Sequence, residues 1–329
     1  MTTSGKRLGG IAASVIVAAV GVGAFVLAAR SGALSPTEAE LRAKYMLPSS
    51  KIVEIDGETI HYADEGQGEP IVLVHGTFGN LRMWSDWVNA LGGHYRVIRF
   101  DRPPYGLSGP DPNGRYGPER EAEIISGLTE KLGLEKFYLA ATSSAGSSVT
   151  QYAAKHPEQI KGLVLSNIAV QAMPADPYRN PWIVRQSRKV AAFLNGWHPE
   201  LEWREVLKVN MVNHDKVTDA LVTEYTELNN RPASYHAAQQ PRPATPSSTR
   251  TPEDLRKITA PTLVLWSEND SERPPKPVAE DAIKFLGSQD KTLIVVPRCE
   301  HMMPLDCGPE SAAAALAFFD RVSANTADQ

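Results

Sequence analysis

The chain has 329 residues, of which 42% are hydrophobic and 22% charged, and its formal net charge is −4. This composition is typical of a globular protein with a sizeable core, and it excludes collagen, a coiled coil, a disordered tail and a bundle of membrane helices. Without a basic run, nucleic acid is not an expected partner. The two cysteines, Cys299 and Cys307, are too few for a disulfide scaffold or a four-thiolate zinc site.

The chain opens with an apolar run, Leu8–Ala29, that contains no charged residue. A helix of about 22 residues spans roughly 33 Å, enough for the hydrocarbon core of a bilayer. We therefore expect a membrane anchor within residues 1–30, followed by a tether at residues 31–50. The alternative is a removed signal peptide, with cleavage sites at Val26–Ala28 or Ala33–Ser35. Basic residues flank the run on both sides and do not decide its orientation, but a short head that stays inside the cell would export the remainder.

From residue 51 onward, strand patterns alternate with helical ones. Ile52–Ile55 and Thr59–Tyr62 flank Asp56-Gly57, which favours a tight hairpin turn. Pro70–Val74 is a continuous apolar run, as expected of a strand buried on both faces. Similar runs are Tyr95–Phe100, Phe137–Ala141, Gly162–Leu165, Thr262–Trp266 and Thr292–Val296. Besides a short amphipathic helix expected at Thr37–Tyr45, before the first strand, helical patterns occur at Leu81–Leu91, Pro118–Leu132, Ser144–His156, Lys276–Leu286 and Glu310–Val322. This order predicts an α/β fold with a doubly wound, mostly parallel sheet.

The interval 170–257 interrupts this alternation. It holds helical patterns at Trp182–Leu194, Glu200–Val209 and Lys216–Leu228, and it ends in a Pro-, Ser- and Thr-rich loop at Gln240–Pro252. A structureless insertion of this size is improbable. We therefore expect a helical cap, inserted after the sixth strand, that divides the core domain into residues 51–169 and 258–329.

A serine-rich turn connects the expected strand at Phe137–Ala141 to the next helix. A nucleophile in such a sharp turn needs small residues two positions to either side, and Ser143 has Ala141 and Ala145 there. Ser144 competes for the role, but its β-branched neighbour Thr142 fits the crowded position less well. The ordinary alternative is a serine that caps the helix.

Three more segments place polar residues just beyond separate buried strands. Glycine beside Thr77 lets the backbone expose N–H groups, as an oxyanion hole requires. Asp270 can orient an imidazole, and His301 follows the last strand. Each segment alone is an ordinary turn, cap or loop. Together they give the order Ser143, Asp270, His301, which is the order of the triad in α/β-hydrolases.

From about Ile52 to Val322 the chain resembles the α/β-hydrolase superfamily. It is most similar to the lidded branch that holds esterases, lactonases, carbon–carbon bond hydrolases, haloperoxidases, epoxide hydrolases and haloalkane dehalogenases. The motifs that carry the resemblance are Tyr62–Gly68, His75-Gly76, Phe100–Ser108, the serine turn, His156–Glu158, Leu263–Asp270 and Cys299–His301. The resemblance implies that the backbone N–H groups of Thr77 and Ser144 form the oxyanion hole. It also implies that the insertion shapes the acyl pocket.

The sequence departs from the family pattern at the serine turn and at the histidine. Alanines replace both glycines of the turn, and Glu300 replaces the usual glycine before His301. A serine at the nucleophile position argues against epoxide hydrolase and dehalogenase chemistry, which needs an attacking carboxylate.

The sequence therefore predicts a serine hydrolase that cleaves a carboxylic ester or lactone through an acyl-enzyme, with Ser143 as nucleophile, His301 as base and Asp270 as its partner. Carbon–carbon bond hydrolysis and non-catalytic ligand binding on the same scaffold are the alternatives. No pattern indicates a metal site or a phosphate-binding loop, so no cofactor is expected. Expected partners are a small ester-like substrate and, if the first segment is retained, a membrane. Cys299 and Cys307 could form a disulfide or remain thiols.

Overall fold

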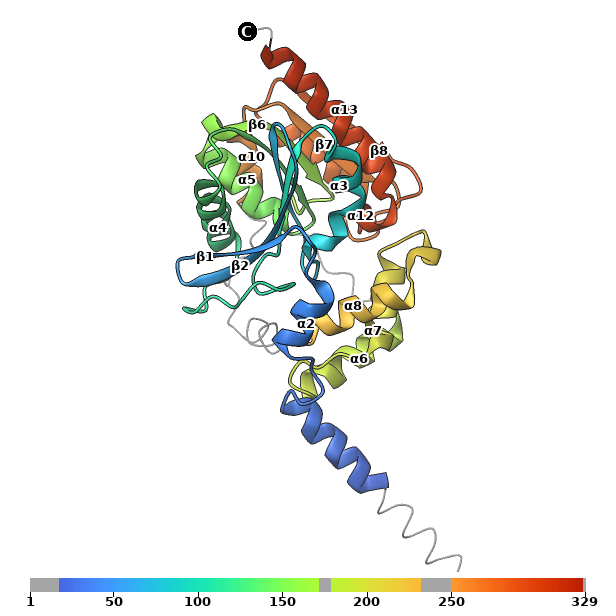
Figure 1. Cartoon of the computed structure of the whole chain (residues 1–329). Coiled ribbons are helices and arrows are strands. Elements are labelled where there is room, and N and C mark those ends of the chain that lie inside the picture. The colour runs from blue at the N-terminus through green and yellow to red at the C-terminus, as the bar shows by residue number, and fades with distance from the viewer. Residues whose placement is uncertain (1–17, 172–178, 232–249, 328–329) are drawn as a thin grey trace, which may run out of the picture.

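The computed structural model describes residues 18–171, 179–231 and 250–327 (Figure 1). Its core is an eight-stranded sheet in the order β1-β2-β4-β3-β5-β6-β7-β8. The strands are β1 (Ser50–Ile55), β2 (Glu58–Gly66), β3 (Pro70–Val74), β4 (Arg96–Phe100), β5 (Phe137–Thr142), β6 (Ile160–Ser166), β7 (Thr262–Ser267) and β8 (Lys291–Val296). Only the pairings of β2 with β1 and β4 are antiparallel. The predicted mostly parallel sheet is thus confirmed.

The hairpin between β1 and β2 turns at Asp56 and Gly57, the dipeptide that predicts it. Both residues have positive φ, 51° and 80°, and Ile55 pairs with Glu58 across the turn. Two successive positive φ angles are typical of a type I′ turn, whose twist matches that of the paired strands. The turn therefore fixes the register of the first two strands.

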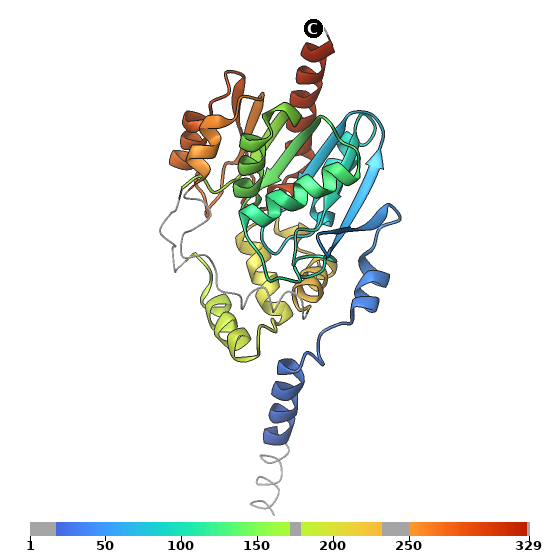
Figure 2. The ribbon, with the colours of Figure 1, turned by 90° about the vertical axis from the view of Figure 1, so that its left-hand side faces the viewer.

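Helices cover both faces of the sheet (Figures 1 and 2). One face packs against α4 (Pro118–Lys131), α5 (Ala145–Lys155), α10 (Thr251–Lys257) and α11 (Glu280–Phe285), and the other against α3 (Ser85–Leu91) and α13 (Gly308–Ala327). In β3, Val72 and Val74 point into the first core, whereas Ile71 and Leu73 point into the second. Because both faces are covered, the strand is apolar throughout.

The last strand differs from this expectation. The sequence predicts a buried strand at Thr292–Val296, but Ile294 and Val295 are 36% and 42% exposed. β8 pairs with β7 on one side, and among the described residues no strand pairs with its other side. Its apolar residues are therefore less covered than those of the central strands.

The cap lies between β6 and β7 in the chain, and its described residues include α6 (Trp182–Phe193), α7 (Glu200–Val209) and α8 (Asp219–Asn229). It sits at the end of the sheet opposite the C-terminus (Figure 2). Trp203, Leu207 and Tyr225 belong to a small core of its own, and Met302 and Leu305 of the main domain pack against that core. The expected loop Gln240–Pro252 lies mostly outside the described residues.

The segment expected to be a tether is packed against the rest of the protein. It contains α2 (Glu38–Tyr45), which begins with a capping box formed by Thr37 and Glu40. Tyr45 is buried, and its hydroxyl donates to Glu227 of α8 at 2.6 Å. Residues before the first strand thus support the cap.

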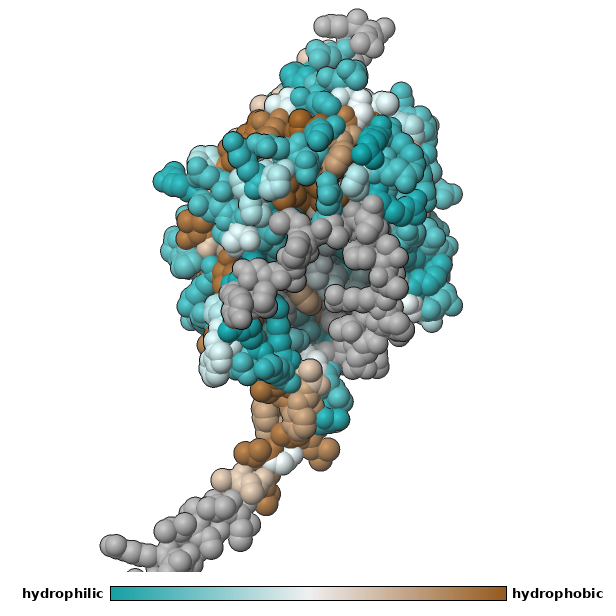
Figure 3. All heavy atoms as spheres, turned by 180° about the vertical axis from the view of Figure 1, so that it is seen from behind, coloured by the Kyte–Doolittle hydropathy of each residue, from teal (hydrophilic) through white to brown (hydrophobic). Residues whose placement is uncertain are grey.

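Residues 18–30 form a helix that projects from the cap end of the molecule, with apolar side chains on its surface (Figure 3). Val20 and Leu27 are 67% and 71% exposed, while Phe25 contacts Trp197 of the cap edge to face, with 5.4 Å between ring centroids. The first half of the predicted anchor, residues 8–17, lies outside the described residues. Within the described part of the chain, no helix is both long and apolar enough to span a bilayer. The anchor therefore remains a prediction.

Candidate active site

Ser143 occupies the sharp turn between β5 and α5, at the carboxyl end of the sheet. Its φ is +56°, in the left-handed region that residues with a Cβ rarely adopt. Such strain is typical of a nucleophile elbow, where it exposes the hydroxyl above the sheet. Ala141 and Ala145, the positions expected to be small, are fully buried.

Two glycines leave room for this elbow. A Cβ on Gly76, in the loop after β3, would lie 2.8 Å from Ser143 Cβ, and a Cβ on Gly146 would lie 2.4 Å from Ile168 Cβ. Both distances are far below the 3.5–4.0 Å that is typical of carbon contacts, roughly the van der Waals optimum. Glycine is therefore needed at 146, one position after Ala145, and in the neighbouring loop.

The structure brings the three expected triad residues together. His301 Nε2 lies 2.9 Å from Ser143 Oγ, and His301 Nδ1 lies 2.9 Å from Asp270 Oδ2. Asp270 Oδ1 accepts from the backbone N–H groups of Glu272 and Arg273 at 2.9 and 2.7 Å. With one carboxylate oxygen held by backbone, the other accepts the Nδ1 proton of the imidazole. This leaves the Nε2 lone pair directed toward the serine hydroxyl.

The two expected oxyanion residues face each other beside the nucleophile. Thr77 N–H donates to Ser144 Oγ at 2.9 Å, and the two hydroxyl groups are 2.7 Å apart. Ser144 also precedes the first turn of α5, where backbone N–H groups point out of the helix. Its hydroxyl therefore satisfies the Thr77 N–H in this state. Because it points to Thr77, Ser144 does not replace Ser143 as partner of the histidine.

A buried histidine and arginine support the Thr77 loop from behind. His75 Nε2 accepts from Arg102 N–H at 2.8 Å, and its Nδ1 donates to Gly76 O at 2.7 Å. Burial, followed by the charge of Arg102, lowers the pKa of His75 to about 4. Arg102 Nη1 continues to Ser144 Oγ at 3.1 Å. A neutral His75 with its proton on Nδ1 thus fixes this side of the site.

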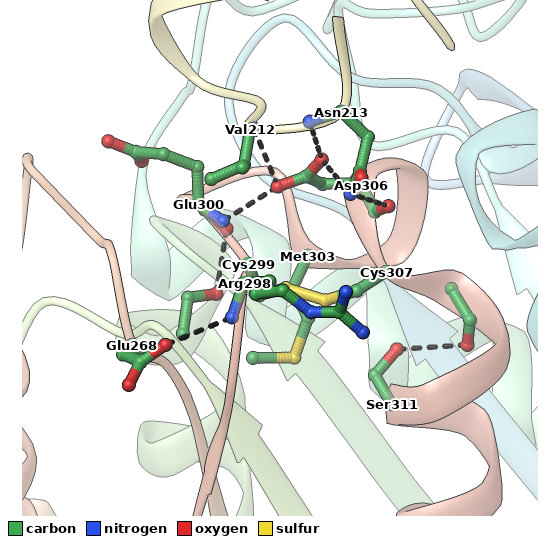
Figure 4. Close-up of a disulfide and its surroundings, with 12 residues drawn as sticks. Val212, Asn213, Glu268, Arg298, Cys299, Glu300, Met303, Asp306, Cys307 and Ser311 are labelled. Carbon is green, nitrogen blue, oxygen red and sulfur yellow. Dashed lines mark hydrogen bonds between the residues drawn. A yellow bond between two sulfur atoms is a disulfide. The ribbon is translucent and has the colours of Figure 1, made fainter. Parts of the chain in front are cut away.

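The loop that carries His301 is closed by a disulfide between Cys299 and Cys307 (Figure 4). The buried Asp306 reinforces it by accepting the backbone N–H groups of Glu300, Val212 and Asn213 at 2.7–2.9 Å. Val212 and Asn213 belong to the cap. One carboxylate therefore joins the cap to the histidine loop, and the cysteine pairing that the sequence leaves open is a disulfide.

Glu300, one of the departures from the family pattern, bridges the acid loop and the histidine loop. Its carboxylate accepts from Ser271 N–H at 3.0 Å and from His301 N–H at 2.5 Å. Burial raises the pKa of Glu300 above its ordinary value. The side chain that replaces glycine thus contributes two contacts that position the triad.

Sequence reasoning missed a charged cluster beside the triad. Arg273 Nη1 lies 3.0 Å from His301 Nε2 and 2.7 Å from Glu272 Oε1. The other carboxylate oxygen of Glu272, Oε2, lies 3.5 Å from Arg179 Nη1. Burial would raise the pKa of Glu272, but His301, Arg273 and Arg179 lower it below its ordinary value. In the sequence Glu272 and Arg273 belong to a polar loop after β7, Arg179 lies far away before α6, and no spacing shows where their side chains point.

The described residues contain no group of three or more His, Cys, Asp or Glu side chains that could hold a metal ion. Acyl transfer to water requires a hydroxyl, an imidazole and a carboxylate in a hydrogen-bonded series, with backbone N–H groups beside the hydroxyl. The site provides this arrangement.

The family model for the alpha/beta hydrolase fold matches residues 69–306, which is more than half of the chain. The chain belongs to the α/β-hydrolase family. It is 26% identical over 258 residues, 74% of this chain and 84% of the relative, to a 2-hydroxy-6-oxononadienedioate/2-hydroxy-6-oxononatrienedioate hydrolase of Comamonas testosteroni.

Solved structures of other enzymes share the fold. A meta-cleavage product hydrolase from Pseudomonas fluorescens superposes with a TM-score of 0.71 at 21% identity, covering 82% of this chain and 97% of that chain. A membrane phospholipase A superposes with a TM-score of 0.69 at 22% identity, covering 97% of this chain and 99% of that chain. At these identities the likeness establishes the fold alone.

Proposed function

We propose that this α/β-hydrolase cleaves a carboxylic ester or lactone through an acyl-enzyme. The observation that supports this most strongly is the hydrogen-bonded series from Ser143 Oγ through the His301 ring to Asp270. Ser143 Oγ attacks the substrate carbonyl carbon while its proton passes to His301 Nε2. Asp270 stabilises the imidazolium that results. The imidazolium then gives this proton to the leaving group, and water hydrolyses the acyl-enzyme by the same route.

The oxyanion of the tetrahedral intermediate would bind at the backbone N–H groups of Thr77 and Ser144. In the resting state the Ser144 hydroxyl occupies the Thr77 N–H. The substrate carbonyl must therefore displace that hydroxyl or accept a hydrogen bond from it. Removing one oxyanion donor typically costs about 10²–10³ in turnover.

Carbon–carbon bond hydrolysis is the second candidate, and the curated relatives favour it. One relative, 26% identical over 254 residues, is a 2-hydroxy-6-oxo-6-phenylhexa-2,4-dienoate hydrolase from Burkholderia cepacia. The same series of serine, histidine and aspartate could serve either reaction, so the triad does not discriminate between them.

A substrate screen on the full chain tests both candidates, with Ser143→Ala as the control. We expect turnover of 4-nitrophenyl esters and covalent labelling of Ser143 by a fluorophosphonate, whereas turnover of a 2-hydroxy-6-oxodienoate alone would support the second candidate instead. Both signals should be lost in the Ser143→Ala protein. If neither substrate class reacts and no label is incorporated, the protein is a ligand-binding member of the fold and the proposal is wrong.

We also propose that Leu8–Ala29 attaches the protein to a membrane, with the catalytic domain outside the cytoplasm. Support comes from the uncharged sequence and from the exposed apolar side chains of the helix at residues 18–30. The full chain should sediment with membranes after an alkaline carbonate wash, and a chain that starts at residue 31 should not. A full-length chain that stays in the supernatant would contradict the anchor, and a mass that lacks the first segment would identify a removed signal.

A further inference from the structure

Arg273 holds a guanidinium against the two groups that exchange a proton in the proposed mechanism. Its Nη1 lies 3.0 Å from His301 Nε2 and 3.4 Å from Ser143 Oγ. The backbone of Arg273 is fixed on both sides, because its N–H donates to Asp270 Oδ1 and its carbonyl accepts from Trp266 Nε1 at 2.7 Å each. The position of this guanidinium is thus set by the same loop that carries the triad carboxylate.

In this position Arg273 and Ser143 compete for one acceptor. A guanidinium has donors and no acceptor, and it stays protonated in proteins. The neutral imidazole of His301 offers a single lone pair at Nε2, which must receive the serine proton during attack. Once that proton has moved, Nε2 is itself a donor and repels the Arg273 N–H. Arg273 therefore loses one of its acceptors at the moment of reaction and keeps Glu272 Oε1, at 2.7 Å.

The charged groups around Arg273 do not fully replace the acceptor lost at His301 Nε2. Glu272 is shared by two guanidinium groups, those of Arg273 and Arg179. Arg179 makes further bonds to neutral acceptors, Ser271 Oγ at 3.1 Å and Asn210 Oδ1 at 2.7 Å. Two guanidinium groups thus share one side-chain carboxylate, and the carboxylate of Asp270 is already engaged by two backbone N–H groups and by His301. The carboxylate of Glu300 accepts instead from the backbone N–H groups of Ser271 and His301.

We propose that Arg273 is a specificity-determining residue that binds a carboxylate on the leaving-group part of the substrate. The inference rests on the hydrolase function proposed above, and it names the substrate class for that site. His301 Nε2 gives its proton to the leaving group, so the leaving group lies against the atom that Arg273 contacts. A carboxylate there supplies an acceptor for the Arg273 guanidinium once His301 Nε2 carries the serine proton.

Charge and shape favour a carboxylate over a phosphate monoester in this position. A carboxylate brings one negative charge near the carboxylates of Asp270 and Glu272, whereas a dianionic phosphate would bring two. The planar fork of arginine also matches a carboxylate with two parallel hydrogen bonds.

Two esters of equal size, 3-acetoxybenzoate and 3-acetoxybenzamide, test the proposal. The leaving group of the first carries a carboxylate, and that of the second carries a neutral amide in the same position. The full chain and its Arg273→Gln and Arg273→Lys variants are assayed by release of the phenol. The control is Arg321→Gln, because Arg321 pairs with Asp290 near the start of β8. Thermal unfolding shows whether each variant is folded, and fluorophosphonate labelling shows whether Ser143 is still reactive.

We expect the full chain to prefer the benzoate by about 10- to 100-fold in kcat/KM, the range for a hydrogen bond to a charged group. Arg273→Gln should bring the ratio close to one, mainly by raising KM for the benzoate. Arg273→Lys should retain part of the preference, and Arg321→Gln all of it. Equal kcat/KM values for the two esters in the full chain, or an equal loss for both in Arg273→Gln, would overturn the proposal while the hydrolase function stands. Absence of hydrolysis and of labelling in the full chain would instead refute the proposed function, and this inference with it.

Discussion

Gly76→Ala tests whether the loop after β3 sets the position of the nucleophile. The added Cβ would lie 2.8 Å from Ser143 Cβ, while carbon atoms pack at about 3.5–4.0 Å. One of the two backbones must therefore move by roughly 1 Å. Ser143 cannot relax easily, because its φ of +56° is already strained and its N–H donates to Ser166 O at 2.9 Å. Either the nucleophile or the Thr77 N–H beside it is displaced.

A misplacement of about 1 Å costs on the order of 10²-fold in rate, so we expect kcat/KM of Gly76→Ala to fall about 100-fold. This is equivalent to about 2.7 kcal/mol of transition-state stabilisation. The assays are 4-nitrophenyl acetate hydrolysis and the rate of fluorophosphonate labelling, with thermal unfolding to show that the variant is folded.

Gly93→Ala is the matched control, since a Cβ on Gly93 meets no atom within 4 Å. It should hydrolyse the ester as the unaltered chain does. If Gly76→Ala were as active as Gly93→Ala and were labelled at the same rate, the close approach of the two loops would have no bearing on the reaction.

Three further predictions concern the residues that hold the site. Replacing Cys299 and Cys307 by serine opens a loop with a sequence separation of 8, and we expect the free energy of unfolding in urea to fall by about 2.5 kcal/mol; an unchanged midpoint would show that the loop is held without the disulfide. The pKa of His75 is lowered from 6.5 to about 4, so its contribution to stability is present above pH 6.5 and is lost as the pH falls toward 4. This loss amounts to about 3 kcal/mol, and it should be missing from the urea titrations of His75→Gln. Burial raises the pKa of Glu300 above 4.5, so its contribution is present below that value and is lost as the pH rises through the folded pKa. Glu300→Gln should therefore gain stability relative to the unaltered chain between pH 4 and pH 8, and a constant difference would contradict a buried, raised carboxyl.

The parts of the fold that could be predicted from sequence are those whose burial is uniform. Every residue of Phe137–Thr142 is buried, so the strand is apolar on both faces and its end is marked by the serine turn. The same contrast between apolar strand and polar end locates Asp270 and His301. The burial of β8 is less uniform, because a strand at the edge of the sheet is covered on fewer sides.

The parts that could not be predicted depend on contacts between distant segments. Glu38 pairs with Arg231 over 193 residues, and no local pattern indicates this ion pair. Whether Cys299 and Cys307 pair depends on the path of the loop, which brings their Cα atoms to 5.8 Å. The position of Arg273 depends on two hydrogen bonds of its backbone, one to Asp270 and one to Trp266 of β7, and a polar loop sequence contains no signal for either.

The docking of α2 has a practical consequence for shortened forms of the protein. The buried guanidinium of Arg231, just beyond α8, donates to Glu38 and to the carbonyl oxygens of Gly106 and Ser108. Removing everything before Ser50 would leave that cation facing two carbonyls without its counter-ion. Recombinant protein for crystals or kinetics should therefore begin ahead of Thr37. A drop in activity after truncation at the first strand would report a weakened support of the cap rather than detachment from a lipid surface.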